Sequence, residues 1–97
     1  MHFEWDESKN SLNVTKHGLD FTDASRLFDW PLLVAPDVRE DYGEVRYIGV
    51  GLLDGRCVVV VFAEPDESTI RIISLRKALS HEQKRYEQYL RNELGAG

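Results

Sequence analysis

Five charged side chains have the types and the spacing to act on a phosphate. Glu44 and Arg46 open one strand-forming segment, and Arg71, Arg76 and Lys77 lie within and just after another. Cleavage of RNA by its own 2′-hydroxyl needs in-line geometry, cations around the phosphorane charge, and proton transfer. Arginine suits the phosphate, and Glu or Lys could move the proton. Glu44, Arg46, Arg71 and Arg76 are therefore catalytic candidates, although the same charges could instead form ion pairs between strands.

The strands that would position these charges are predicted from apolar density and turn residues. Thr69–Leu75 is rich in β-branched residues, and Arg56–Ala63 is apolar on both faces, which indicates a central strand. The short Pro65–Ser68 turn predicts that these two strands are neighbours. Asp54-Gly55 predicts a tight hairpin between Arg56–Ala63 and an alternating strand at residues 45–53. Leu32–Ala35 could add one short strand.

Three helices are predicted around these strands. The first runs from about Glu7 to His17, capped by Asp6 and ended by Gly18. The second begins after Asp20 or Thr22 and stops at Trp30-Pro31. The third follows a capping box made by Ser80 and Gln83. Its apolar stripe contains Tyr86, Tyr89, Leu90 and Leu94, and an apolar seam of Trp5, Leu12 and Leu19 is expected on the first helix.

The polar face of the first helix has two interpretations. It carries Lys9, Asn10, Asn13, Lys16 and His17. The face is either a solvated surface or part of a basic surface that binds RNA. Under the second interpretation, Lys9, Lys16 and His17 bind RNA together with Lys77.

The order of elements predicts the fold class. Two helices, then three or four strands joined by short turns, then one helix indicate an α+β fold with a twisted antiparallel sheet. The 97 residues are expected to form one domain. We see no repeats or linkers that would divide the chain.

Composition narrows the function. The net charge of -5 argues against binding of nucleic acid by bulk electrostatics, but cations outnumber acids from Arg71 to Arg91. Scattered histidines and the absence of phosphate-loop, CxxC or HExxH motifs predict no metal and no cofactor. A single cysteine fits a cytoplasmic location, and the longest apolar run, Cys57–Ala63, is too short to span a membrane.

Two patterns together resemble the BrnT toxin family. The first half carries Trp5-Asp6, Lys9-Asn10, Asn13 and Lys16-His17-Gly18, followed by Phe21 and Phe28. The second half carries Glu44-x-Arg46 and the run RIISLRKA from Arg71 to Ala78, before a helix with Glu82 and Tyr86. The resemblance covers nearly the whole chain. One departure is Leu75, where the family pattern usually has Ala.

The resemblance implies a RelE-like fold and a metal-independent endoribonuclease that blocks translation by cutting RNA. It also implies a type II toxin–antitoxin system with a BrnA-like antitoxin that carries a ribbon-helix-helix domain. The toxin–antitoxin pairs would dimerise, and operator DNA would be bound only through the antitoxin. The rival interpretation is a non-catalytic binding module that acts in a transcription-regulating complex.

Overall fold

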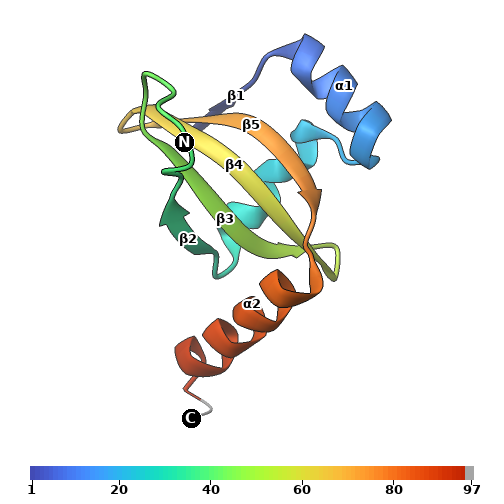
Figure 1. Ribbon diagram of the computed structural model, residues 1–97, viewed down its shortest axis with the longest axis vertical. Helices are drawn as coiled ribbons and strands as arrows, with labels where there is room; N and C mark the ends of the chain where they lie inside the picture. Colours follow the sequence, from blue (N-terminus) through green and yellow to red (C-terminus); the bar gives the residue numbers. More distant parts are fainter. Residues whose placement is uncertain (96–97) are drawn as a thin grey trace.

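A five-stranded sheet with helices on both faces forms the body of the computed structural model, which describes residues 1–95 (Figure 1). The strand order is β1-β5-β4-β3-β2. The elements in chain order are β1 (His2–Glu4), α1 (Glu7–His17), the 3-10 helix η1 (Phe21–Asp29), β2 (Leu33–Pro36), β3 (Arg46–Leu53), β4 (Arg56–Asp66), β5 (Thr69–Lys77) and α2 (Ser80–Glu93).

The α+β class is confirmed, but the expected sheet of three to four antiparallel strands is wrong. The described sheet has five strands and is mixed, because β1 pairs with β5 in parallel, with Phe3 opposite Ile70. Three residues are too few for an alternating pattern to stand out in the sequence. The predicted pairing of Arg56–Ala63 with Thr69–Leu75 is confirmed, as is the Asp54-Gly55 hairpin, whose two residues have φ of 51° and 80°.

Helix α1 has the predicted bounds and ends. Asp6 Oδ1 accepts hydrogen bonds from the backbone N–H groups of Ser8 and Lys9, and Gly18 adopts the left-handed conformation. The expected seam through Leu12 is wrong, because Leu12 is 70% exposed. The buried residues of α1 are Asn10 and Asn13, whose side chains make hydrogen bonds inside the fold.

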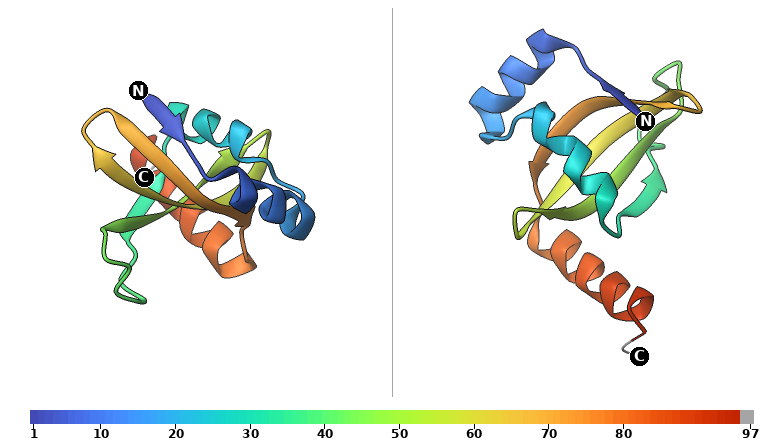
Figure 2. Two further views of the ribbon diagram at one scale, coloured as in Figure 1. Left: turned by 90° about the horizontal axis from the view of Figure 1, so that it is seen from above. Right: turned by 180° about the vertical axis from the view of Figure 1, so that it is seen from behind.

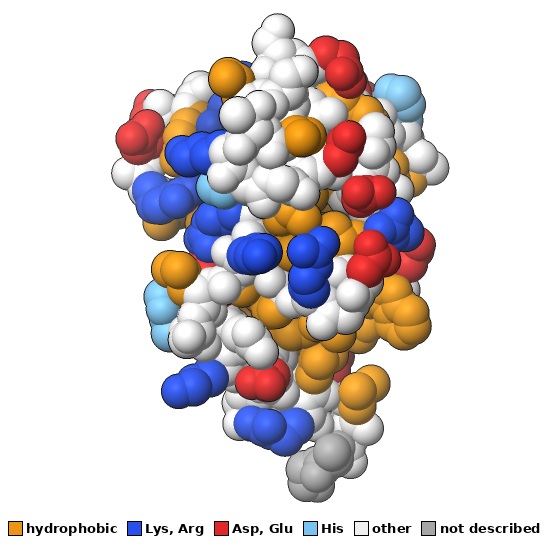
Figure 3. All heavy atoms as spheres, turned by 90° about the vertical axis from the view of Figure 1, so that its right-hand side faces the viewer, with side chains coloured by type: hydrophobic (Ala, Val, Ile, Leu, Met, Phe, Trp, Pro, Cys, Tyr) orange, Lys and Arg blue, Asp and Glu red, His pale blue; other side chains and the backbone are white. Residues whose placement is uncertain are grey.

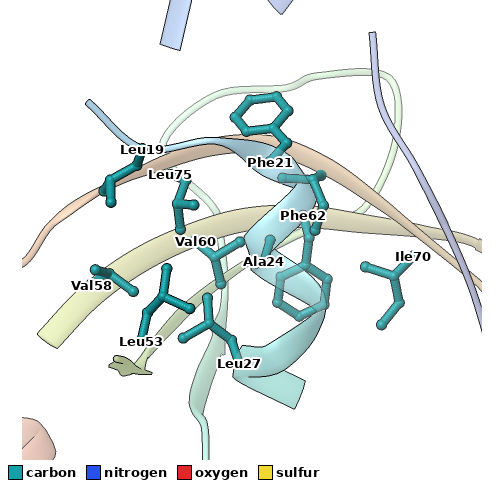
Figure 4. Close-up of a cluster of buried hydrophobic side chains, with 11 residues drawn as sticks. Leu19, Phe21, Ala24, Leu27, Leu53, Val58, Val60, Phe62, Ile70 and Leu75 are labelled. Atoms are coloured by element: carbon teal, nitrogen blue, oxygen red, sulfur yellow. The ribbon is translucent and has the colours of Figure 1, made fainter. Parts of the chain in front are cut away.

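The main core lies between η1 and one face of the sheet (Figures 2 and 4). Alternate residues of β4 point into this core, and η1 contributes three side chains. The buried members of the core are Leu19, Phe21, Ala24, Leu27, Leu53, Val58, Val60, Phe62, Ile70, Ile72 and Leu75. Gly51 of β3 leaves room for Leu32, because a Cβ there would lie 2.8 Å from Leu32 Cδ1. The strand glycine therefore marks a close approach by a side chain.

Helix α2 packs on the opposite face of the sheet. Tyr86 is buried with Val50 and Val59, and its hydroxyl donates to the carbonyl of Pro31 at 2.6 Å. The predicted capping box of Ser80 and Gln83 is wrong by one residue. The N-cap is Leu79, and its N–H donates to the carboxylate of Glu82 at 2.8 Å. Leu94, at the end of the predicted stripe, is exposed.

A β-bulge in β5 decides where its arginines point. Val61 lies opposite Ser74, but the next residue of β4, Phe62, lies opposite Ile72, so Ile73 is an extra residue. Successive side chains of a strand point to opposite faces of the sheet. Without the bulge, Arg71 and Arg76, which are five positions apart, would therefore face opposite sides. With the bulge, Arg71 lies opposite Ala63 and Arg76 opposite Val59, so both face the side of α2.

Candidate RNA-binding and catalytic surface

Three of the four predicted catalytic residues meet at one end of β5. Glu44 Oε1 accepts from Arg46 Nε at 3.2 Å, and Glu44 Oε2 accepts from Arg71 Nη1 at 3.3 Å. Arg71 Nε also donates to Glu4 of β1 at 2.7 Å. We call these four residues the paired cluster. The ion pairs between strands, which the sequence left as an alternative, are therefore present.

The fourth candidate, Arg76, lies elsewhere on the same strand. Its cross-strand partner Val59 is four residues from Ala63, the partner of Arg71, so the two arginines are roughly 13 Å apart along the sheet. Arg76 lines an open hollow with Lys16, His17, Lys77 and Leu79, which we call the cation hollow. Lys16 and His17 come from the end of α1. Arg76 and Lys77 come from the end of β5, and Leu79 from the segment before α2.

A second hollow extends this basic surface along α1. It is lined by Lys9, Leu12, Asn13, Lys16, His17, Ile73 and Ser74, so the two hollows share Lys16 and His17. All four predicted RNA-binding residues, Lys9, Lys16, His17 and Lys77, thus border one continuous region. Figure 3 shows Lys and Arg side chains gathered across the side of the molecule that α1 and the end of β5 share.

Asn13 holds the two halves of this surface together. Its Nδ2 donates to the carbonyls of Leu19 and Leu75 at 2.9 Å each, and its Oδ1 accepts from the N–H of Leu75 at 3.2 Å. One side chain thereby pairs with the backbone edge of β5 as a neighbouring strand would. Asn10 ties α1 to the start of η1, because its Oδ1 accepts from Phe21 N–H and its Nδ2 donates to the side-chain Oδ1 of Asp20. These bonds fix Lys16 and His17 beside Arg76 and Lys77.

Arg76 is held from the other side by Glu82 of α2. Arg76 Nη1 donates to Glu82 Oε1 at 2.8 Å, and Nη2 donates to Oε2 at 2.9 Å. This two-point contact with Arg76 holds the pKa of Glu82 at about 2, against an ordinary value of 4.5, although burial opposes the shift. In turn, the hydrogen bonds to Glu82 raise the pKa of Arg76. Both groups are therefore charged at neutral pH.

The two clusters differ in net charge, which decides how each would meet a phosphate. The paired cluster contains two arginines and two glutamates and sums to zero. In the described part of the chain, the charged side chains Lys16, Arg76 and Lys77 line the cation hollow, and Glu82 pairs with Arg76, which gives a formal charge of +2 when histidine is not counted. The hollow is consequently the better anion site, even though the whole chain has a net charge of -5.

Two other kinds of site, a metal site and a cysteine nucleophile, have little support among residues 1–95. No three His, Cys, Asp or Glu side chains in this range come together as a metal site would require. Burial raises the pKa of the Cys57 thiol, which suits a core residue better than a nucleophile. Within the same range, no helix combines the length and apolarity needed to cross a membrane.

The fold and the site together define a small α+β protein that carries a basic surface along one edge of a mixed sheet. The family model described as the ribonuclease toxin BrnT of type II toxin–antitoxin systems matches residues 5–82. The chain is also similar to the 1.1 Å crystal structure of the Brucella abortus ribonuclease toxin BrnT. That match has a TM-score of 0.69 and 30% identity, and it covers 82% of this chain and 99% of the other. No curated protein sequence matches the chain.

The chain therefore belongs to the BrnT family of ribonuclease toxins of type II toxin–antitoxin systems. This confirms the resemblance seen in the sequence. Membership of such a system implies an antitoxin as a partner.

Several residues of the site escaped the sequence analysis. Glu4 was not linked to Arg71, because β1 itself was not predicted. Asn13 was treated as part of a surface, whereas it is only 7% exposed. Glu82 entered only as part of the family pattern. A carboxylate three residues beyond Leu79 is the spacing of a capping-box acceptor, and this signal could have drawn attention to it.

Proposed function

We propose that this toxin stops translation by cutting RNA without a metal ion, and that the reacting phosphate binds in the cation hollow. The observation that carries the proposal is the meeting of Lys16, His17, Arg76 and Lys77, from opposite ends of the sequence, around one hollow. Cations that are brought this close together repel one another, and a bound anion would offset that repulsion. A phosphate with negative charge that grows in the transition state is such an anion.

The chemistry requires few parts. The 2′-hydroxyl of a nucleotide attacks the adjacent phosphorus, and the bond to the 5′-oxygen of the next nucleotide breaks. The products are a 2′,3′-cyclic phosphate and a 5′-hydroxyl. Arg76, Lys77 and Lys16 would stabilise the phosphorane. His17, whose imidazole can accept or donate a proton, would take the proton of the 2′-hydroxyl and return one to the departing 5′-oxygen.

The paired cluster has a secondary task in this proposal. Arg71 and Arg76 face the same side of the sheet, so a single strand of RNA lying along β5 would meet both clusters. Arg46 and Arg71 would then guide the RNA, and Glu44 would hold the two guanidinium groups in place. A direct catalytic role for Glu44 requires that RNA displaces its two arginine partners.

Substitutions separate these roles. Removal of a single preorganised donor commonly costs ~10²–10³-fold in rate. We expect a loss of this size for Arg76→Ala and less than about tenfold for Arg71→Ala or Glu44→Gln. Arg91→Ala, on the exposed part of α2, is the matched control and should leave the rate unchanged. Cleavage of a labelled RNA in EDTA, together with growth and RNA integrity after induction in a bacterium, gives the readout.

The rival function remains a binding module in a transcription-regulating complex. One observation favours it, namely that Arg46, Arg71 and Arg76 each already have a carboxylate partner. A folded wild-type chain that neither cleaves RNA nor arrests growth would refute the ribonuclease proposal and support this rival.

The proposed antitoxin is BrnA-like, with a ribbon-helix-helix domain that binds operator DNA. A partner could silence the toxin by covering the cation hollow, and acidic groups on the partner would speed its capture. Two toxin–antitoxin pairs would form the repressing complex. Toxin that is titrated with its antitoxin should lose RNA binding and cleavage together.

A further inference from the structure

The hydrogen bonds of Arg76 leave one edge of its guanidinium group unused. Nη1 donates to Glu82 Oε1 at 2.8 Å and to the Lys77 carbonyl at 3.2 Å, so both of its hydrogens are engaged. Nη2 donates once, to Glu82 Oε2. Among residues 1–95, Arg76 Nε donates to no acceptor, which leaves Nε–H and one Nη2 hydrogen.

The positions of these two hydrogens follow from the planarity of the group. Glu82 contacts Nη1 and Nη2 together, so it occupies the end of the guanidinium plane. The second hydrogen of Nη2 then lies on the side edge, parallel to Nε–H. Two parallel N–H groups at this spacing are the fork that binds two oxygens of one phosphate.

Glu82 is itself held firmly. Its Oε1 also accepts the N–H of Leu79 at 2.8 Å, and its side chain is only 18% exposed. One turn later, Tyr86 anchors α2 through its buried ring and its bond to the Pro31 carbonyl. A largely buried carboxylate that is held at Oε1 by a backbone N–H is a firm support for a guanidinium group.

We infer that Glu82 is a positioning residue, which fixes Arg76 so that its free Nε–Nη2 edge binds the phosphate of the RNA. This inference rests on the proposed function and deepens it. Glu82 has opposite effects on two steps. Its negative charge weakens the attraction of phosphate to the hollow, whereas its two-point contact orients the donors for the transition state.

The other arginine of β5 offers an internal comparison. Arg71 uses Nε for Glu4 and Nη1 for Glu44, so its side edge is already occupied. The two guanidinium groups share a strand and a sheet face, yet only Arg76 has the free fork. Phosphate should therefore affect Nε–H of Arg76 and leave that of Arg71 unchanged.

Kinetics of Glu82→Gln test the positioning role. Glutamine can still accept the Leu79 N–H, so the helix start is kept, but its amide nitrogen cannot accept from Arg76. We expect kcat for RNA cleavage to fall tenfold or more. The Kd for a 2′-O-methyl oligonucleotide, which cannot be cleaved, should become lower, because a negative charge has been removed. A structural defect alone would lower the active fraction with no gain in affinity.

Two further variants separate charge from geometry. Glu82→Asp keeps the charge but is too short for the same contact, and its kcat should fall at least as far as that of Glu82→Gln. Arg76→Lys keeps the cation without the fork and should be as inactive as Arg76→Ala. Folded fractions are checked by thermal unfolding. A kcat within threefold of wild type for Glu82→Gln would overturn the inference.

A second measurement does not depend on catalysis. In ¹⁵N NMR spectra, addition of inorganic phosphate should shift the Nε–H resonance of Arg76, identified by its loss in Arg76→Lys, and leave that of Arg71 in place. If wild-type protein cuts no RNA but shows this shift, the proposed ribonuclease function fails and the phosphate fork stands. If Arg71 responds and Arg76 does not, the inference is refuted whatever the cleavage assay shows.

Discussion

Substitution of Asn13 by Ala should destabilise the toxin more than any change on the exposed side of α1. The buried Asn13 side chain makes three hydrogen bonds, two to carbonyls and one from the N–H of Leu75. A typical bond contributes ~0.5–1.5 kcal/mol net, so the three together contribute about 2–4 kcal/mol. Alanine returns up to ~0.7 kcal/mol through its higher helix propensity. The expected loss in the free energy of unfolding is therefore about 1–4 kcal/mol.

Urea denaturation measures this loss directly, provided that the m-value stays constant. Asn92→Ala is the matched control, because it is the same substitution in a helix at an exposed position. It gains the same propensity without losing buried bonds, so it should be neutral or slightly stabilising. A loss below about 0.5 kcal/mol for Asn13→Ala, relative to this control, would refute the claim that Asn13 replaces a strand at the edge of β5.

Three other outcomes are expected. The carboxylate of Glu82, with its pKa of about 2, stabilises the fold above pH 4.5, and this contribution is lost as the pH falls toward 2. Glu82→Gln should flatten the fall of Tm in that range, and an unchanged slope would contradict the pair with Arg76. Gly51→Ala should cost ~1–3 kcal/mol by crowding Leu32, and Leu32→Ala should relieve part of that cost in a urea double-mutant cycle; strict additivity would exclude the clash. In gel-shift experiments the isolated toxin should not bind operator DNA specifically, whereas the complex with its antitoxin should. Specific binding by the toxin alone would contradict the proposal that operator DNA is bound only through the antitoxin.

Local signals were enough to predict several parts of this protein. Helix α1 begins after Asp6 and ends before Gly18 as its caps indicate, because each end of a helix is decided by a few adjacent residues. The Asp54-Gly55 turn set the register of β3 against β4 in the same way. The candidates Lys16, His17, Arg76 and Lys77 were all identified from residue type and pattern.

Only the tertiary structure decided how these residues are grouped. The bulge at Ile73 places Arg71 and Arg76 on one face of the sheet, and no local sequence pattern indicated that extra residue. The parallel pairing of β1 joined Glu4 to Arg71 across 67 positions of the chain. Burial of Asn13 became favourable only once the edge of β5 supplied partners for its amide. Such contacts depend on segments that are distant in sequence, so their energy is absent from any local window, and the division into a paired cluster and a cation hollow was fixed by packing alone.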